Sequence, residues 1–296
     1  MHFHNNNHHK LPIVFVHKGY EAYLQLNILH CQSMGAQVFV ISDFPYQHCH
    51  WIPIHTYVST SFRKIYVHLS AHAKIFELFC FERWLILNQF LHDKNIDSFL
   101  YLDSDCVIYD LSCPTDRLTL SGDAPSTSND ISKSGHALFG NRESLAQFCD
   151  FLLDTYRDKQ AIDRLRFLRK IRCPNKKMGG ISDMALLAQY AWYYPDRVYL
   201  GTSRPVGEIY IEDNMNSTSG NFVMENGLKK IQFENKQPYG FLKSGQKVRF
   251  ANLHFQGGAK KHLARYLHVD TTAMTPLSRY EVFKTMLMIW MGRFKI

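Results

Sequence analysis

The amino-acid sequence predicts an α/β fold: one domain with a mostly parallel central sheet, helices on its flanks and a small helical tail at the C-terminus. The first observation is a β-α-β start, in which the strand-like runs 12–16 ("PIVFV") and 37–43 ("QVFVISD") enclose apolar residues at helical spacing over 21–34. The second is another buried run, 99–111 ("FLYLDSDCVIYDL"), which follows a long apolar segment. Such units favour parallel strands joined by right-handed crossovers, and ligands bind beyond the carboxyl ends of those strands.

The remaining elements follow from the same patterns. We expect residues 44–71 to be irregular, 73–92 to form a long buried helix and 112–136 to form a loop. A short strand at "HALFGN" (136–141) is followed by a basic helix over 144–172 and by a helix over 182–194 capped by Ser182. A series of short strands over 199–250 comes last. No linker divides the chain. The predicted organisation is a disordered tail over 1–10, one domain over 11–270 and a basic amphipathic helical tail over 271–296.

Composition narrows the classes of function. The 296 residues are 46% hydrophobic, which is enough for a sizeable core, and the net charge of +8 favours an anionic partner. The seven cysteines form no C-x-x-C pair, and no stretch is long and apolar enough to span a bilayer, so we expect reduced thiols and a cytoplasmic protein. The basic aromatic segment 278–296 could lie on the inner face of an anionic membrane or pack on the domain.

Asp103 and Asp105 are the first residues that carry chemistry. Side chains two apart on a strand point the same way, so both carboxylates can converge where the strand leaves the sheet. At about 4 Å and an effective dielectric of about 20, each like-charge contact with a phosphate costs about 4 kcal/mol, so an anionic ligand requires a cation between them. The pair therefore indicates a metal site, although a surface D-x-D turn is the alternative.

A second motif lies far downstream in "LHFQGGAK". His254 follows a strand-like run, Gly257 allows close approach of the backbone to a ligand, and Lys260 could neutralise a phosphate. An imidazole and two carboxylates suit Mn²⁺ better than Ca²⁺, and Mg²⁺ is also compatible.

These residues together resemble the GT-A glycosyltransferases, a Rossmann-like fold family. His254-x-x-Gly257-x-x-Lys260 is similar to the H-x-x-G-x-x-K signature of family 8, the branch of glycogenin and bacterial galactosyltransferases. The resemblance implies that Asp103, Asp105 and His254 hold Mn²⁺ or Mg²⁺ on the diphosphate of the donor, with Lys260 and the backbone near Gly257 on the same diphosphate.

The resemblance also implies roles for residues elsewhere. Arg83 corresponds to an arginine that reaches the nucleotide sugar, and Asp183 in "GGISDMALL" to an acid near sugar and acceptor. Tyr20 is a candidate for base stacking and Asp43 for ribose contact. We also expect two further residues to bind the donor: His17, which opens "HKGY", and Ser104, which lies between the two acids.

The predicted function is that of a metal-dependent hexosyltransferase with Asp183, Asp105 and Lys260 as catalytic residues. It would move a sugar from a nucleotide-diphosphate sugar, with a UDP-sugar favoured, to a hydroxyl acceptor such as a glycan or a lipid-linked glycan. The resemblance implies retention of configuration, whereas Asp183 as a base would give inversion.

Other classes remain open. "DSDCV" also fits the nucleophile motif of haloacid-dehalogenase phosphatases, and a nucleotidyltransferase could use Asp103 and Asp105 as well. The basic run 157–177 would suit a module that binds membranes or nucleic acid, but its apolar residues fall at helical spacing, which favours a solvated basic face over a core stripe. We therefore expect no nucleic-acid partner.

Overall fold

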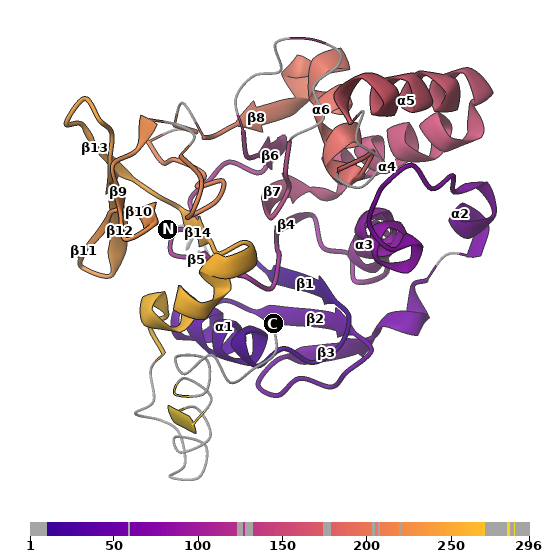
Figure 1. The fold of residues 1–296 in the computed structure, drawn as a ribbon. Coiled ribbons are helices and arrows are strands. Elements are labelled where there is room, and N and C mark those ends of the chain that lie inside the picture. Colours follow the sequence, from indigo (N-terminus) through magenta and orange to yellow (C-terminus); the bar gives the residue numbers. More distant parts are fainter. Residues whose placement is uncertain are drawn as a thin grey trace, which may run out of the picture.

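The central sheet has five strands in the order β3-β2-β1-β4-β7 (Figure 1). The structure is a computed structural model that describes residues 11–58, 60–122, 127, 133–173, 179–202, 205–206, 208–218, 221–269, 283–284 and 287. Four strands are parallel and the fifth is antiparallel to its neighbour: β1 (Ile13–His17), β2 (Val38–Ser42), β3 (His50–Pro53), β4 (Ser98–Leu102) and β7 (Ala137–Asn141). The predicted α/β class with a mostly parallel sheet is confirmed.

Helices cover both faces of this sheet because its strands are buried on both sides. Alternate residues of β1 and β4 belong to two different apolar clusters, so that Val14 packs on one face and Ile13 and Phe15 on the other. The helix α1 (Ala22–Ser33) lies on the second face, while the first is covered by three helices: α3 (Lys74–Asp93), α4 (Arg142–Arg157) and α6 (Asp183–Tyr193). Because helices cover both faces, the ends of the four parallel strands and the loops that follow them form the accessible edge of the sheet.

Three expected elements differ from the observed ones. Residues 44–71 are not wholly irregular, since they contain β3, a 3₁₀ turn (Ile54–Thr56) and α2 (Thr60–Ile65). The expected helix over 144–172 is two helices, α4 and α5 (Lys159–Arg172), because the chain is extended at Asp158, whose side chain accepts the Gln160 N–H at 2.8 Å. The expected loop over 112–136 contains β6 (Leu118–Leu120), which pairs in parallel with β8 (Val198–Leu200).

The helix α6 begins at Asp183 with Ser182 as its N-cap, as expected. Ser182 occupies the N-cap position without a side-chain hydrogen bond to the helix. The nearby glycine is required by the fold, since Gly180 has φ of +142° and a Cβ there would lie 2.4 Å from the Ser70 Cα. The bridge between Ser70 and Gly180 thus holds the start of α6 against the segment that precedes α3.

The C-terminal half of the chain returns to the sheet through a second pairing. β5 (Cys106–Ile108) pairs antiparallel with β14 (Asn252–His254), which places His254 opposite Cys106. Between β8 and β14 the chain forms two small antiparallel sheets, whose strands are β9 (Met224–Glu225), β10 (Leu228–Lys229), β11 (Ile231–Glu234), β12 (Gln237–Phe241) and β13 (Lys247–Arg249). A 3₁₀ segment (Gly257–Tyr266) follows β14. Since β5 follows Asp105 directly, this pairing brings the second motif to the first.

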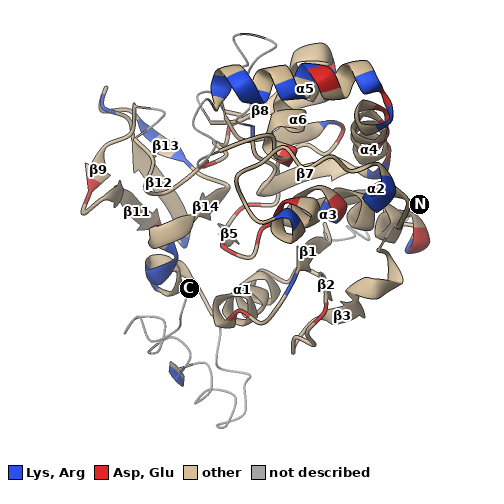
Figure 2. Ribbon diagram, turned by 45° about the vertical axis from the view of Figure 1, so that its right-hand side comes forward, with Lys and Arg blue, Asp and Glu red and all other residues tan. Residues whose placement is uncertain are grey.

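The basic helix α5 has the expected solvated face over a core stripe. Ala161, Ile162, Leu165 and Leu168 are buried, whereas most of the arginines and lysines that recur along α5 (Figure 2) are exposed. The expected absence of a nucleic-acid partner stays a prediction.

Two predictions fall on segments that are largely outside the described residues. Residues 1–10 are not described, and of the predicted tail over 271–296 only Phe283, Lys284 and Leu287 are, all three helical and exposed. None of the helices in the described ranges is both long and apolar enough to cross a membrane. Cytoplasmic location and membrane contact through 278–296 stay predictions.

His30 links three parts of this fold from a buried position on α1. Its Nε2 lies 2.6 Å from the Ile108 carbonyl oxygen, and its Nδ1 lies 2.9 Å from the His268 N–H nitrogen. The ring therefore fits as a neutral imidazole with the proton on Nε2. Burial lowers the pKa of His30 to about 4 from its usual 6.5, against the opposing effect of the two backbone contacts.

We predict that His30 makes the fold acid-sensitive. Its contribution to stability is present above pH 6.5 and is lost as the pH falls towards 4, because the unfolded chain binds a proton that the folded chain excludes. The full loss is about 3 kcal/mol. Urea unfolding between pH 7 and 4.5 should show a steeper pH dependence for the wild type than for His30→Gln. Equal slopes for the two proteins would contradict the prediction.

Candidate active site

The carboxyl ends of β1, β2 and β4 bring most of the predicted site residues to one edge of the sheet. His17 ends β1, Asp43 follows β2 and Asp103 follows β4. Asp103, Asp105 and His254 each offer one oxygen or nitrogen atom within 4.8 Å of the others. The pairing of β5 with β14 therefore completes a cluster from residues that are far apart in the sequence.

Asp105 is held by two cationic side chains. His254 Nε2 lies 3.5 Å from Asp105 Oδ1, and Lys260 Nζ lies 3.2 Å from Oδ2. Burial alone would raise the pKa of Asp105, but the contacts with His254 and Lys260 lower it below its ordinary value. Burial alone would lower the pKa of His254, but the contacts with Asp105 outweigh this effect and raise the pKa to about 9. In this state the imidazolium and the carboxylate form a buried ion pair.

The ring of His254 is fixed by residues that no sequence motif indicated. Its Nδ1 lies 2.7 Å from the Asp213 carbonyl oxygen, its backbone N–H donates to Glu212 Oε2 at 2.7 Å, and its ring stacks on His136 with centroids 4.0 Å apart. A proton on Nδ1 bonded to a carbonyl leaves Nε2 as the group that faces Asp105. His254 is thus oriented as a ligand by its surroundings.

Asp103 belongs to a second branch of the same cluster. Its Oδ1 accepts hydrogen bonds from Arg83 at 2.7 Å and from the Tyr101 hydroxyl at 2.6 Å. Arg83 also donates to Asp183 Oδ2 at 2.6 Å, and the Trp84 indole donates to the same oxygen at 3.0 Å. Arg83 therefore joins the acid at the end of β4 to the acid at the start of α6.

The loops after β1 and β2 carry an aromatic group at the rim. Tyr20 is 49% exposed and stacks on Tyr46 with a centroid distance of 5.8 Å, and Phe44 lies against both rings. The Asp43 carboxylate accepts the Gly19 N–H at 2.6 Å, which ties the two loops together. An exposed aromatic face beside the acids suits a flat ligand such as a nucleobase.

Among the residues predicted to bind the donor, His17 has an unsatisfied ring nitrogen. Its Nε2 is buried with no hydrogen-bond partner in the described part of the chain, and burial lowers the pKa of the ring despite the charges of Asp103 and Asp43. Ser104 contributes its backbone oxygen to Asn27 Nδ2 at 3.3 Å. Gly257 has φ of +56°, and a Cβ at this position would meet no described protein atom within 4 Å, so its backbone faces open space.

The side chains of Asp103, Asp105 and His254 form a ligand set that fits a divalent metal. Two carboxylates and one neutral imidazole suit Mn²⁺ or Mg²⁺. The metal would take the place of the proton on His254 Nε2, since a histidine must be neutral to ligate. The residues that would hold it are Asp103, Asp105 and His254.

Sequence reasoning missed several residues of the site. Tyr101 could have been found, because it lies two residues before Asp103 on the same side of the strand. His136 precedes β7 and reaches the site only because β7 runs antiparallel to β4, and Glu212 and Asp213 lie in a segment without a motif.

Behind His254 lies a fully buried cation. Lys229 Nζ is 2.7 Å from Glu212 Oε1 and also contacts the Asp213 carboxylate, and neither Lys229 nor Glu212 has an exposed side chain. Since Glu212 in turn accepts the His254 N–H, this ion pair supports the metal-ligand candidate from the far side.

We predict that Lys229→Met lowers the free energy of unfolding by about 3 to 5 kcal/mol, because it leaves the Glu212 carboxylate buried without a counter-charge. Lys247→Met is the matched control: Lys247 contacts Glu234 at a partly exposed position, and its loss should cost about 1 kcal/mol or less. Urea unfolding of both variants measures the difference. Equal costs would show that the buried ion pair has no special weight.

Comparison with known proteins gives only weak structural similarity to glycosyltransferases. No protein-family model and no curated protein matches the sequence. A glycosyltransferase involved in the glycosylation of the major capsid of PBCV-1 aligns with a TM-score of 0.43 and 12% identity, over 86% of this chain and 99% of that one.

Two further glycosyltransferase structures align more weakly. The bifunctional glycosyltransferase WbbM, in its apo form, gives a TM-score of 0.40 and 12% identity over 95% of this chain and 52% of that one. The PaToxG glycosyltransferase gives a TM-score of 0.34 and 12% identity over 62% of this chain and 69% of that one. At these values the likeness assigns neither a family nor an activity, so function has to be argued from the site.

Proposed function

We propose that this chain is a metal-dependent glycosyltransferase that moves a sugar from a nucleotide-diphosphate sugar to a hydroxyl acceptor. The observation that carries the proposal is the convergence of Asp103, Asp105 and His254, with Lys260 beside them, at the carboxyl edge of a parallel sheet. A GT-A fold of family 8 type is part of the proposal, with a UDP-sugar as donor and a glycan or lipid-linked glycan as acceptor.

The charges of the site suit a diphosphate only with a cation present. Asp103 and Asp105 would repel phosphate oxygens, and together with His254 they would hold Mn²⁺ or Mg²⁺. The bound metal supplies Lewis-acid stabilisation of the negative charge that grows on the departing nucleoside diphosphate.

Lys260 has a role of its own in this scheme. Its ammonium group now contacts Asp105 and lies 3.5 Å from the Tyr23 hydroxyl, on a side chain that is 23% exposed. Once Asp105 is neutralised by another cation, Lys260 can turn to a phosphate oxygen and stabilise the leaving group electrostatically. The open backbone at Gly257 leaves room for the diphosphate.

The nucleoside is placed at the aromatic rim. Tyr20 offers an exposed ring for base stacking, while Asp43, which already fixes the backbone of Gly19, offers a second carboxylate oxygen to the ribose. His17 contributes its unpartnered Nε2 between the rim and the acids.

Asp183 is placed on the acceptor side. Its Oδ2 already accepts two hydrogen bonds, from Arg83 and Trp84, so the side chain is fixed in position and partly neutralised. A carboxylate held in this way suits the positioning of a sugar or an acceptor hydroxyl better than abstraction of a proton. This supports a retaining outcome, with Asp183 as a base giving inversion as the alternative.

We predict metal-dependent hydrolysis of one or more nucleotide sugars by the purified chain, measured as release of the nucleoside diphosphate. The activity should appear with Mn²⁺ and vanish with chelator. Asp105→Asn and His254→Ala should each lower it by about 10²-fold or more, because each removes a metal ligand. Asp110→Asn is the matched control: Asp110 lies just past β5, contacts Arg249 instead of the site, and should keep the activity.

Different products would point to different enzymes. Release of phosphate from simple monoesters would favour a phosphatase, and exchange of pyrophosphate into a nucleotide sugar would favour a nucleotidyltransferase. Absence of metal-dependent turnover with every donor of the panel would contradict the glycosyltransferase proposal.

A further inference from the structure

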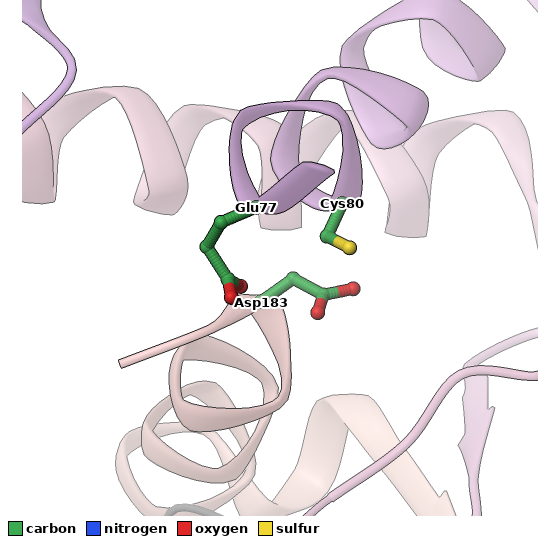
Figure 3. A group of neighbouring side chains, drawn as sticks. All are labelled: Glu77, Cys80 and Asp183. Atoms are coloured by element: carbon green, nitrogen blue, oxygen red, sulfur yellow. The ribbon is translucent and has the colours of Figure 1, made fainter. Parts of the chain in front are cut away.

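A second group of potential metal ligands lies beside the proposed site. Glu77, Cys80 and Asp183 each offer one ligand atom within 4.8 Å of the others. Glu77 and Cys80 are three residues apart on α3 and so share one face of the helix, and both side chains extend from it towards Asp183 at the start of α6 (Figure 3). None of these atoms belongs to the cluster of Asp103, Asp105 and His254.

Glu77 is a buried carboxyl group without a hydrogen-bond partner in the described part of the chain. It is 1% exposed, and neither carboxylate oxygen has a hydrogen-bond partner of normal geometry among the described residues. Burial raises the pKa of Glu77, and the charge of Asp183 adds to this effect, while the neighbouring Ser70 hydroxyl opposes it only in part. A buried carboxyl group without a partner costs several kcal/mol unless a proton or a cation neutralises it.

Arg83 supplies only part of that neutralisation, because its charge lowers the pKa of Glu77 against the larger effect of burial. Its two terminal nitrogens donate to Asp103 and Asp183, so one guanidinium already serves two carboxylates. His72 also lowers the pKa of Glu77, and neither His72 nor Arg83 hydrogen-bonds to its carboxylate in the described part of the chain. The hydrogen bonds to Asp183 are both to Oδ2, and none is formed by Oδ1 among those that the structure shows.

Cys80 adds a soft sulfur ligand to the two hard carboxylate ligands, Glu77 and Asp183. Its thiol is partly buried, and burial and the charge of Asp183 raise its pKa, so it is a thiol in the absence of a cation. A coordinating divalent ion would release that proton, as it does for any ligating cysteine. Sulfur and carboxylate oxygen together suit Zn²⁺ and similar thiophilic ions rather than Mg²⁺ or Ca²⁺.

We propose that Glu77, Cys80 and Asp183 form a second cation site, selective for a thiophilic divalent ion of the zinc class. Three protein ligands leave a coordination position open, which is the pattern of zinc sites that bind a water or a substrate oxygen. The binding itself does not depend on the glycosyltransferase proposal. If that proposal holds, the open position lies on the acceptor side of the reaction, where Asp183 is placed.

The test uses Co²⁺ as a spectroscopic stand-in for Zn²⁺ on the full-length, metal-stripped protein. Ligation by a thiolate gives Co²⁺ a charge-transfer band in the near ultraviolet, whereas ligation by carboxylate or imidazole does not. We expect the band to rise to a plateau as Co²⁺ is added and to disappear when Zn²⁺ is added. Cys80→Ser should abolish it, and Cys49→Ser, which removes another partly buried thiol outside both acidic clusters, should leave it unchanged.

Two further variants test whether the Co²⁺ band arises at this cluster. Glu77→Gln keeps the shape of the side chain and should weaken Co²⁺ binding by about 10-fold or more, even if Cys80→Ser does not fold. Asp105→Asn should leave the band intact, because Asp105 belongs to the other site. A wild-type protein without the band, a band that survives Cys80→Ser, or unchanged affinity in Glu77→Gln would each overturn the second site and leave the proposed function untouched.

Discussion

The contact of Asp105 with His254 and Lys260 is the interaction on which the rest of the site depends. A carboxylate at the end of a buried strand has to be compensated, and the compensation comes from the far end of the chain. The pairing of β5 with β14 delivers it, and the buried pair of Lys229 and Glu212 holds β14 in place. The fold itself therefore brings Asp105, His254 and Lys260 together.

Arg83 extends this compensation across the edge of the sheet. It joins Asp103, which is one of the proposed metal ligands, to Asp183, which belongs to the second acidic cluster. The two clusters therefore share one cation and are electrostatically linked. A change of charge in one cluster alters how strongly Arg83 stabilises the carboxylate of the other, so the two clusters cannot be tuned independently.

The sequence predicted the parts of this arrangement that have local signals. The strands that lead to His17, Asp43 and Asp103 are apolar runs, and parallel pairing alone brings their ends together. β3 was missed because its burial pattern is mostly exposed or intermediate, and the break at Asp158 because apolar residues continue on both sides of it. The supports of His254 carry no local signal, since they meet only through tertiary packing.

The most direct test of the central claim is X-ray diffraction from crystals grown with Mn²⁺ and UDP, with data recorded so that manganese gives an anomalous signal. The account predicts one strong anomalous peak bonded to Asp103, Asp105 and His254 Nε2, with Lys260 moved from Asp105 towards the diphosphate. A structure with UDP bound and no manganese at these three residues, the His254–Asp105 contact being intact, would contradict it.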